Sequence, residues 1–176
     1  MLTSRRALLV SLIVAISVVA IPTASAKHEA TFPQIGVFVP GKSLAGVQIG
    51  MTPAQVRKLW GANFRVCKLA LCSGTTTWYY IYSKGEPVGA AVVFKGGKVV
   101  TVFTLGSPSG WHTQEGLAVG EEIDRVTDLY GKTGWKVCIG YGAMTIHGDK
   151  VVSSVYTTGE AVYGFALGLP TEPVCQ

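Results

Sequence analysis

The sequence predicts an α+β protein made of two tandem units, in each of which a short helix packs on one face of an antiparallel β-sheet. Three observations support this: a glycine-framed segment that occurs twice, helix signals in each copy, and strand-like runs after each copy. Placed side by side, the two sheets would form one continuous curved surface. The predicted segments are a signal peptide at 1–26, an extended N-terminal segment at 27–43, repeat unit 1 at 44–105, a linker at 106–115 and repeat unit 2 at 116–176.

The repeated segment covers residues 46–61 and, 70 positions later without a gap, residues 116–131. Self-similarity at a fixed offset is typical of a duplicated supersecondary unit. Three further positions are similar in kind. The identical pairs are Gly46/Gly116, Gly50/Gly120, Val56/Val126, Leu59/Leu129 and Gly61/Gly131.

Each copy carries helix signals. In the first copy Thr52 is suited to the N-cap, Pro53 to the first helical position, and Gln55 completes a capping box. Gly61 is a natural stop. The second copy has a poorer cap, but its acidic start favours a helix N-terminus. Helices of about nine residues are not stable alone, so both must pack on another element.

The stretches that follow the helices have the composition of strands, with many β-branched and aromatic residues. Gly96 and Gly97 separate two such runs, as in a hairpin with a two-residue turn. The predicted strands cover residues 75–82, 90–94, 99–105, 143–147, 150–157 and 161–167.

The first 26 residues have the layout of a secretory signal peptide. Arg5 and Arg6 precede a 15-residue uncharged run, and small residues at 24–26 form a cleavage site. The run is shorter than the roughly 20 apolar residues that a membrane-spanning helix needs. We therefore expect cleavage before Lys27, no stable membrane anchor afterwards, and a location outside the cell or in its envelope.

Four cysteines remain in the exported chain, an even number. Disulfides are the rule in that compartment, and three pairings are possible. We favour Cys67–Cys72 with Cys138–Cys175. The cysteines lack the spacing of a metal site, and no histidine stands beside any of them.

Four aromatic residues are candidates for contact with a partner. Trp78, Tyr80 and Tyr82 alternate along one predicted strand and therefore share a face, which either packs under a helix or stands exposed. Trp111 lies in the predicted linker, where it is either exposed or covers the seam between the units. Because Tyr79 makes the opposite face of that strand apolar too, a partner is expected to cover one side.

No catalytic residue, metal site or cofactor is predicted. Residues 36–43 match the letters of a phosphate-binding P-loop, but no helix follows at once and Pro40 removes a needed N–H. No convergent set of titratable groups is visible. The formal net charge of +5 is uneven, with residues 44–105 basic and residues 116–176 acidic. No nucleic-acid-binding motif occurs, so we expect no nucleic-acid partner.

The string Gly-Val-x-Ile-Gly-Met-Thr-x-x-x-Val-x-x-Leu-x-Gly at residues 46–61, followed by strands with Trp-Tyr, resembles two related groups. One is the β-lactamase inhibitor protein type, a tandem of helices on a curved antiparallel sheet. The other is the SmpA/OmlA type of small outer-membrane lipoprotein, with a single unit. Two copies, and cysteines in each half, are more similar to the first. The resemblance covers about residues 44–167 and implies architecture and a tendency to bind proteins.

We therefore predict a secreted, non-catalytic protein-binding module whose partner is another protein. The resemblance implies two roles for such a module, enzyme inhibition and association with the cell envelope. The first alternative is a cell-wall or carbohydrate-binding protein that uses its tryptophans and tyrosines. The second alternative is a hydrolase.

Overall fold

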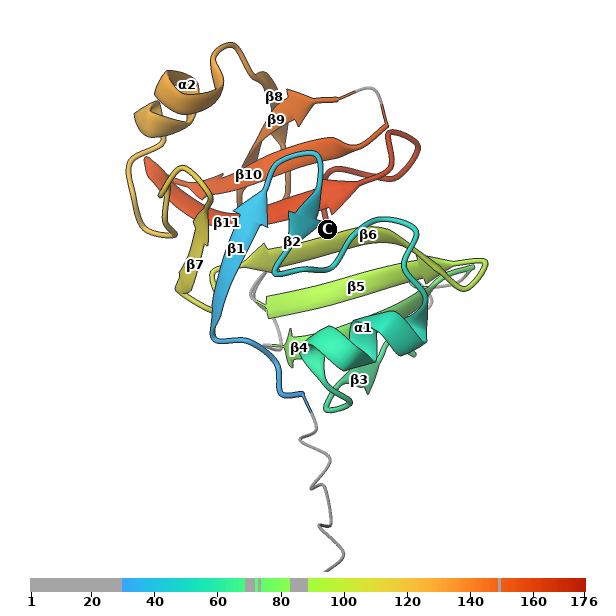
Figure 1. The fold of residues 1–176 in the computed structure, drawn as a ribbon. Helices are drawn as coiled ribbons and strands as arrows, with labels where there is room; N and C mark the ends of the chain where they lie inside the picture. Colours follow the sequence, from blue (N-terminus) through green and yellow to red (C-terminus); the bar gives the residue numbers. More distant parts are fainter. Residues whose placement is uncertain (1–29, 69–71, 73, 83–88, 149) are drawn as a thin grey trace, which may run out of the picture.

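The computed structural model describes residues 30–68, 72, 74–82, 89–148 and 150–176. The predicted signal peptide lies outside these ranges. Within them the chain forms two helices and eleven strands (Figure 1). In chain order these are β1 (Ile35–Val39), β2 (Ser43–Leu44), α1 (Pro53–Trp60), β3 (Arg65–Val66), β4 (Thr76–Tyr82), β5 (Gly89–Lys95), β6 (Lys98–Leu105), β7 (Gly110–Thr113), α2 (Asp124–Tyr130), β8 (Gly134–Val137), β9 (Gly142–His147), β10 (Val152–Thr158) and β11 (Ala161–Gly168).

The described strands form one large and one small sheet. The large sheet has eight antiparallel strands in the order β3-β4-β5-β6-β11-β10-β9-β8. The small sheet has the order β2-β1-β7, in which β1 pairs antiparallel with β2 and parallel with β7. In Figure 1 the small sheet crosses in front of the large one, between α1 and α2.

The predicted α+β class of two tandem helix-plus-sheet units is wrong. The described part of the chain is mostly β, with 46% strand and only 12% helix. Its eight-stranded sheet is continuous through the β6–β11 pair, so neither half has a sheet or a core of its own. Within the segments predicted as an extended N-terminal stretch and a linker, residues 35–39 and 110–113 form β1 and β7 of a second sheet.

The recurring glycines have a local cause. Gly46 and Gly116 have φ of +82° and +87°, and Gly50 and Gly120 have φ of +86° and +93°. A side chain is strained in this left-handed region, which glycine enters freely. Matching turns therefore precede both helices, and the same residue recurs in each. The recurring glycines therefore show that two similar turns occur in one protein, and they do not define two separate units.

Predictions from short-range turn and cap signals are confirmed. α1 begins at the Thr52 cap, with the full capping box to Gln55, and ends at Gly61. Gly96 and Gly97 form the two-residue turn between β5 and β6. These signals depend on neighbours in the chain, so the sequence suffices to read them.

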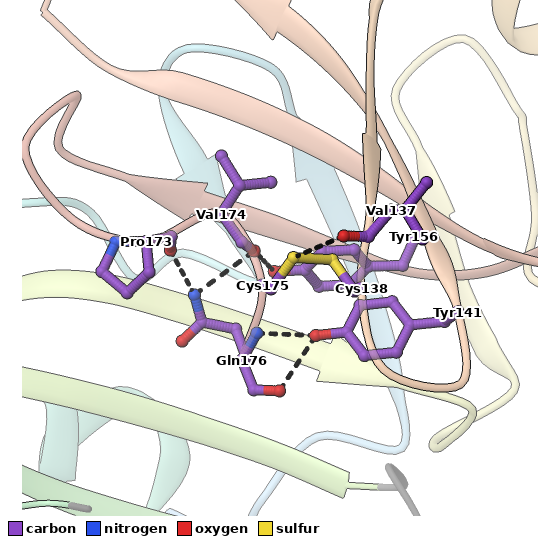
Figure 2. Close-up of a disulfide and its surroundings, with 8 residues drawn as sticks. All are labelled: Val137, Cys138, Tyr141, Tyr156, Pro173, Val174, Cys175 and Gln176. Carbon is purple, nitrogen blue, oxygen red and sulfur yellow. Dashed lines mark hydrogen bonds between the residues drawn. A yellow bond between two sulfur atoms is a disulfide. The ribbon is translucent and has the colours of Figure 1, made fainter.

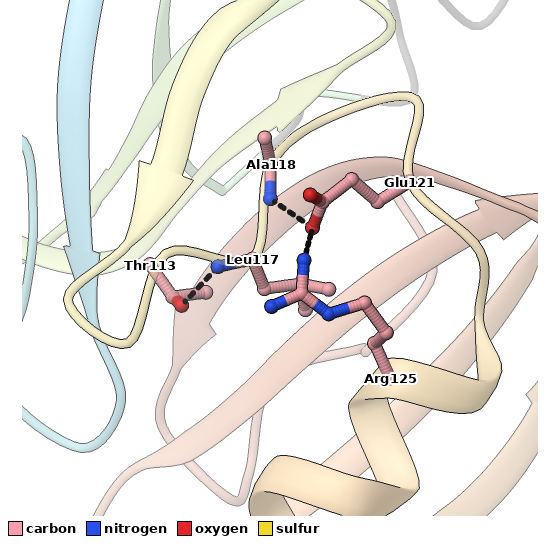
Figure 3. A network of polar contacts seen from close by, with 5 residues as sticks. All are labelled: Thr113, Leu117, Ala118, Glu121 and Arg125. Atoms are coloured by element: carbon pink, nitrogen blue, oxygen red, sulfur yellow. Dashed lines mark hydrogen bonds and ion pairs between the residues drawn. The ribbon is translucent and has the colours of Figure 1, made fainter.

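The turn from β7 into α2 is fixed by side chains that the helix signals did not identify (Figure 3). The N-cap residue of α2 makes no side-chain hydrogen bond. Instead, Glu121 Oε2 accepts from the Ala118 N–H at 3.0 Å and pairs with Arg125 Nη1 at 2.6 Å. Thr113 Oγ1 accepts from the Leu117 N–H at 3.1 Å. The acidic start of this segment thus closes the preceding turn.

The main core lies between the large sheet and a layer made of both helices and the small sheet. An aromatic cluster occupies one part of it, with five pairs of ring centroids 5.1–5.9 Å apart. Its members are Phe32, Trp60, Tyr80 and Trp111. Both helices and the small sheet therefore cover the same face of the large sheet.

The expectation that Trp111 stands exposed as a partner-binding residue is wrong. Trp111 is fully buried, and its Nε1–H donates to the Pro33 carbonyl at 3.1 Å. The Gly36 backbone lies against the indole, where an added Cβ would come within 2.8 Å of ring atoms. The cause is the parallel pairing of β7 with β1, which joins residues that are far apart in the chain.

Trp111→Ala should lower the free energy of unfolding by about 3–5 kcal/mol, because it opens a large cavity and leaves the Pro33 carbonyl without its donor. Urea denaturation followed by circular dichroism measures the loss. Trp135→Ala is the matched control, since Trp135 is 58% exposed, and should cost about 1 kcal/mol or less. Equal losses in the two variants would contradict the assignment of Trp111 to the core.

Candidate functional site

The face of the large sheet turned away from the helices carries a second apolar cluster, which we call the tyrosine face. Successive residues of a strand point to opposite sides, so a row that starts at Trp78 enters the main core while the row that starts at Tyr79 faces the other way. The cluster contains Ala91, Phe103, Leu105, Tyr141, Ala143, Tyr156 and Ala166, with Tyr79, Val93, Cys138, Tyr163 and Val174 packed against it.

A β-bulge in β4 decides which aromatic residue belongs to which face. The register with β5 shifts between Tyr79 and Ile81, which breaks the alternation. Trp78 and Tyr80 pack with the main core. Tyr82 is 49% exposed, and its ring centroid lies 5.5 Å from that of Tyr79. The predicted common face of Trp78, Tyr80 and Tyr82 is therefore wrong. The structure brings Tyr79 and Tyr82 together instead.

Trp78 and Tyr80 have structural contacts that account for them. The Tyr80 hydroxyl donates to the Gly61 carbonyl at 3.2 Å, and burial raises its pKa well above 10. Phe64 stacks on Trp78 with ring centroids 3.9 Å apart, and the Arg57 guanidinium lies 4.8 Å from a Trp78 ring centroid. These contacts tie β4 to α1 and to the segment after it.

The chain after β11 folds over the tyrosine face as a strap, residues 169–176. The Cys138–Cys175 disulfide, one of the two favoured pairings, ties the strap to the end of β8 (Figure 2). Glu172 Oε1 pairs with Lys95 Nζ of β5 at 3.4 Å. The cavity beneath the strap measures only about 10 Å³, which is about the space of one water molecule, so the strap packs closely.

Two tyrosines hold the strap by its backbone, as Figure 2 shows. The Tyr156 hydroxyl donates to the Val174 carbonyl at 2.6 Å. The Tyr141 hydroxyl donates to the Gln176 carbonyl at 2.9 Å and accepts from the Gln176 N–H at 2.6 Å. Burial raises the pKa of both hydroxyls, that of Tyr156 well above 10, so both stay protonated and able to donate.

Beside the strap lies a groove of about 260 Å³ over β4, β5 and β6. The other favoured disulfide, Cys67–Cys72, places Cys72 at its edge. Tyr79 lines the groove, and Tyr82 lies beside it, outside the lining. Among the described residues neither of these two hydroxyls has a hydrogen-bond partner. Besides the cysteines, the groove is lined mainly by Thr77, Tyr79, Val93, Phe103, Glu172 and Pro173.

Two other surfaces expose large apolar side chains. One is a shallow hollow of about 360 Å³ on the small sheet beside α1, where Ile35 is 73% exposed. The other is the edge strand β8, where Val137 is 76% exposed and Ile139, just after it, 95% exposed. Neither surface is recognisable in the sequence, because strands as short as β1 and β8 carry too weak an alternation of apolar and polar residues.

The described part of the chain contains no group of three or more His, Cys, Asp or Glu side chains placed to hold a metal ion. None of its helices is long and apolar enough to cross a membrane. Residues 36–43 run along β1, through a turn closed by the Lys42 N–H on the Val39 carbonyl, and into β2. This is a hairpin, whereas a phosphate-binding loop leads from a strand into a helix.

No protein family model and no curated protein matches the chain. Solved structures with a similar fold include an extracellular protein containing an SCP domain from Bacillus anthracis (TM-score 0.50, 13% identity, 69% of this chain and 44% of that one). A cysteine-rich secretory protein from Staphylococcus aureus also matches (TM-score 0.45, 14% identity, 81% and 49%). The chain thus spans less than half the length of either.

At 13% identity the Bacillus anthracis match shows a similarity of fold alone. The resemblance to the β-lactamase inhibitor protein and SmpA/OmlA types stays a prediction. The two disulfides agree with a protein that folds outside the reducing cytoplasm.

Tyr156→Phe removes the hydroxyl that holds Val174 and should cost about 1 kcal/mol at pH 7. Above about pH 10 Tyr156 ionises in the unfolded wild type but is kept neutral by burial in the folded state. The wild type therefore loses stability as the pH rises, and the variant loses less. Urea denaturation from pH 7 to pH 11 measures both curves. A difference between them that does not change with pH would contradict this account.

Proposed function

We propose that the chain is an extracytoplasmic, non-catalytic module that binds another protein through the groove of the tyrosine face. One observation carries the proposal, the contrast between two pairs of tyrosines. The hydroxyls of Tyr141 and Tyr156 grip the backbone of the strap. Those of Tyr79 and Tyr82 have no partner within the described residues, although they present the same chemistry beside it.

The chemistry of the groove fits a polypeptide. Tyr79, Val93 and Phe103 supply apolar area, and tyrosine is among the residues enriched where binding energy concentrates. Burial raises the pKa of Tyr79, so its hydroxyl stays a donor at neutral pH. On the same face such hydroxyls already donate to peptide carbonyls, as in the pair Tyr156 and Val174.

An enzymatic role has little support in the groove. Its described lining contains one carboxylate side chain, that of Glu172, which is already paired with Lys95. Acid–base or nucleophilic catalysis needs a convergent set of titratable groups. We therefore infer binding without chemical conversion.

A place outside the cytoplasm, secreted or in the envelope, follows from three features together. The first 26 residues have the layout of a signal peptide. Both disulfides suit an oxidising compartment. The Bacillus anthracis protein of similar fold is described as extracellular.

The variants Tyr79→Ala and Tyr82→Ala should each weaken partner binding by about tenfold or more, as expected for aromatic anchors. Tyr82→Ala should leave thermal stability almost unchanged because the side chain is half exposed. The measurement is capture of envelope proteins by the immobilised, oxidised mature protein, followed by titration of the captured protein against each variant.

Two matched controls decide between surfaces. Ile35→Ser alters the hollow beside α1 and Trp135→Ala alters the β8 edge, and both should retain binding. If either loses binding while the tyrosine variants keep it, the groove is not the site. Binding of the wild type to wall polysaccharide, with no captured protein, would favour the carbohydrate-binding alternative.

A further inference from the structure

Part of the tyrosine face is hidden by the chain itself. Tyr156 is fully buried and Tyr141 is 7% exposed, both beneath or beside the strap. The groove over β4–β6 and the covered part over β10–β11 belong to the same cluster of side chains. The open groove is therefore only part of a larger surface.

The strap rests on this surface without belonging to the sheet. None of the β-ladders among the described residues includes it, and its last ladder-like bond is from the Leu169 N–H to the Val100 carbonyl. After Leu169, backbone groups of the strap form hydrogen bonds with the hydroxyls of Tyr141 and Tyr156, and the Glu172 carboxylate forms an ion pair with Lys95. A polypeptide segment from another protein can make every one of these contacts.

We propose that the strap is a displaceable occupant of the binding face, held in place by the Cys138–Cys175 disulfide. When this bond is reduced, the strap leaves, and an extended segment of the partner that carries a carboxylate for Lys95 takes its position on Tyr141 and Tyr156. The identity of the displacing segment rests on the proposed function, whereas the release of the strap does not.

The release step is a thiol–disulfide exchange with an external dithiol. The S–S bond between Cys138 and Cys175 breaks, two thiols form in the protein, and the dithiol is oxidised to its own disulfide. Both cysteines are partly exposed, so the reductant can reach them. The contacts that remain are a few hydrogen bonds, the Lys95–Glu172 ion pair, 62% exposed on its lysine side, and the packing of Val174 on the apolar cluster. A terminal segment held by so few contacts opens locally far more readily than a core.

Release is tested on the full mature chain by the reactivity of Tyr141 and Tyr156 toward N-acetylimidazole, mapped by mass spectrometry. In the double variant Cys138→Ala/Cys175→Ala, Tyr156 should react about tenfold faster or more than in the wild type. The matched control Cys67→Ala/Cys72→Ala removes the other disulfide and leaves the strap tied, so Tyr156 should stay unreactive. Unchanged amide exchange in β5 and β6 shows that the core remains folded.

Should the double variant not fold, the same reactivity is measured in the wild type before and after adding a dithiol. The proposal is overturned if Tyr156 stays unreactive in the reduced wild type. It is also overturned if Tyr156 becomes reactive only when the backbone amides of the whole core exchange as well.

The second measurement is the affinity for the captured partner, which should rise about tenfold in the double variant. Released tyrosines with unchanged affinity for a captured partner overturn the role of the strap as a competing occupant. Released tyrosines with no protein captured by any form support the release step and count against the proposed function alone.

Discussion

The pairing of β6 with β11 sets the position of almost every other element. It places Phe103 opposite Ala166 and Val102 opposite Leu167, and so joins eight strands into one sheet. The turns before the helices are attached to these same two strands, through the Gly50 N–H on Val99 and the Gly120 N–H on Val162. Because both helices and the strap start from this central pair, its register decides what covers each face.

The two faces of the sheet are covered in different ways, and the difference carries the functional argument. One face is closed by the helices and the small sheet, which bury a continuous core. The other is covered over part of its area by a short strap, which a disulfide holds. A strand that is apolar on both sides needs cover on both sides. On the face of Tyr79 and Tyr82 that cover is incomplete in the described chain, which leaves room for a partner.

The sequence predicted the features that depend on near neighbours or on chemistry alone. The Thr52 cap, the Gly96-Gly97 turn and the positions of the longer strands were readable because each is fixed within a few residues. The two disulfides were favoured because the cysteines divide evenly between the halves. The prediction of two separate units from the recurring glycines is wrong. A turn with left-handed backbone favours glycine wherever it occurs, so two similar turns can share glycines without marking a repeated unit.

The sequence by itself therefore determined the cap of α1, the tight turns, the longer strands and the disulfide chemistry of this protein. The tertiary structure alone decided the second sheet and the face on which each aromatic residue lies. The bulge after Tyr79 reverses the side of Tyr82, and the parallel pairing of β7 with β1 buries Trp111. Both depend on registers between strands that are distant in the chain. Such registers are set by the packing of the whole core, which no local pattern records.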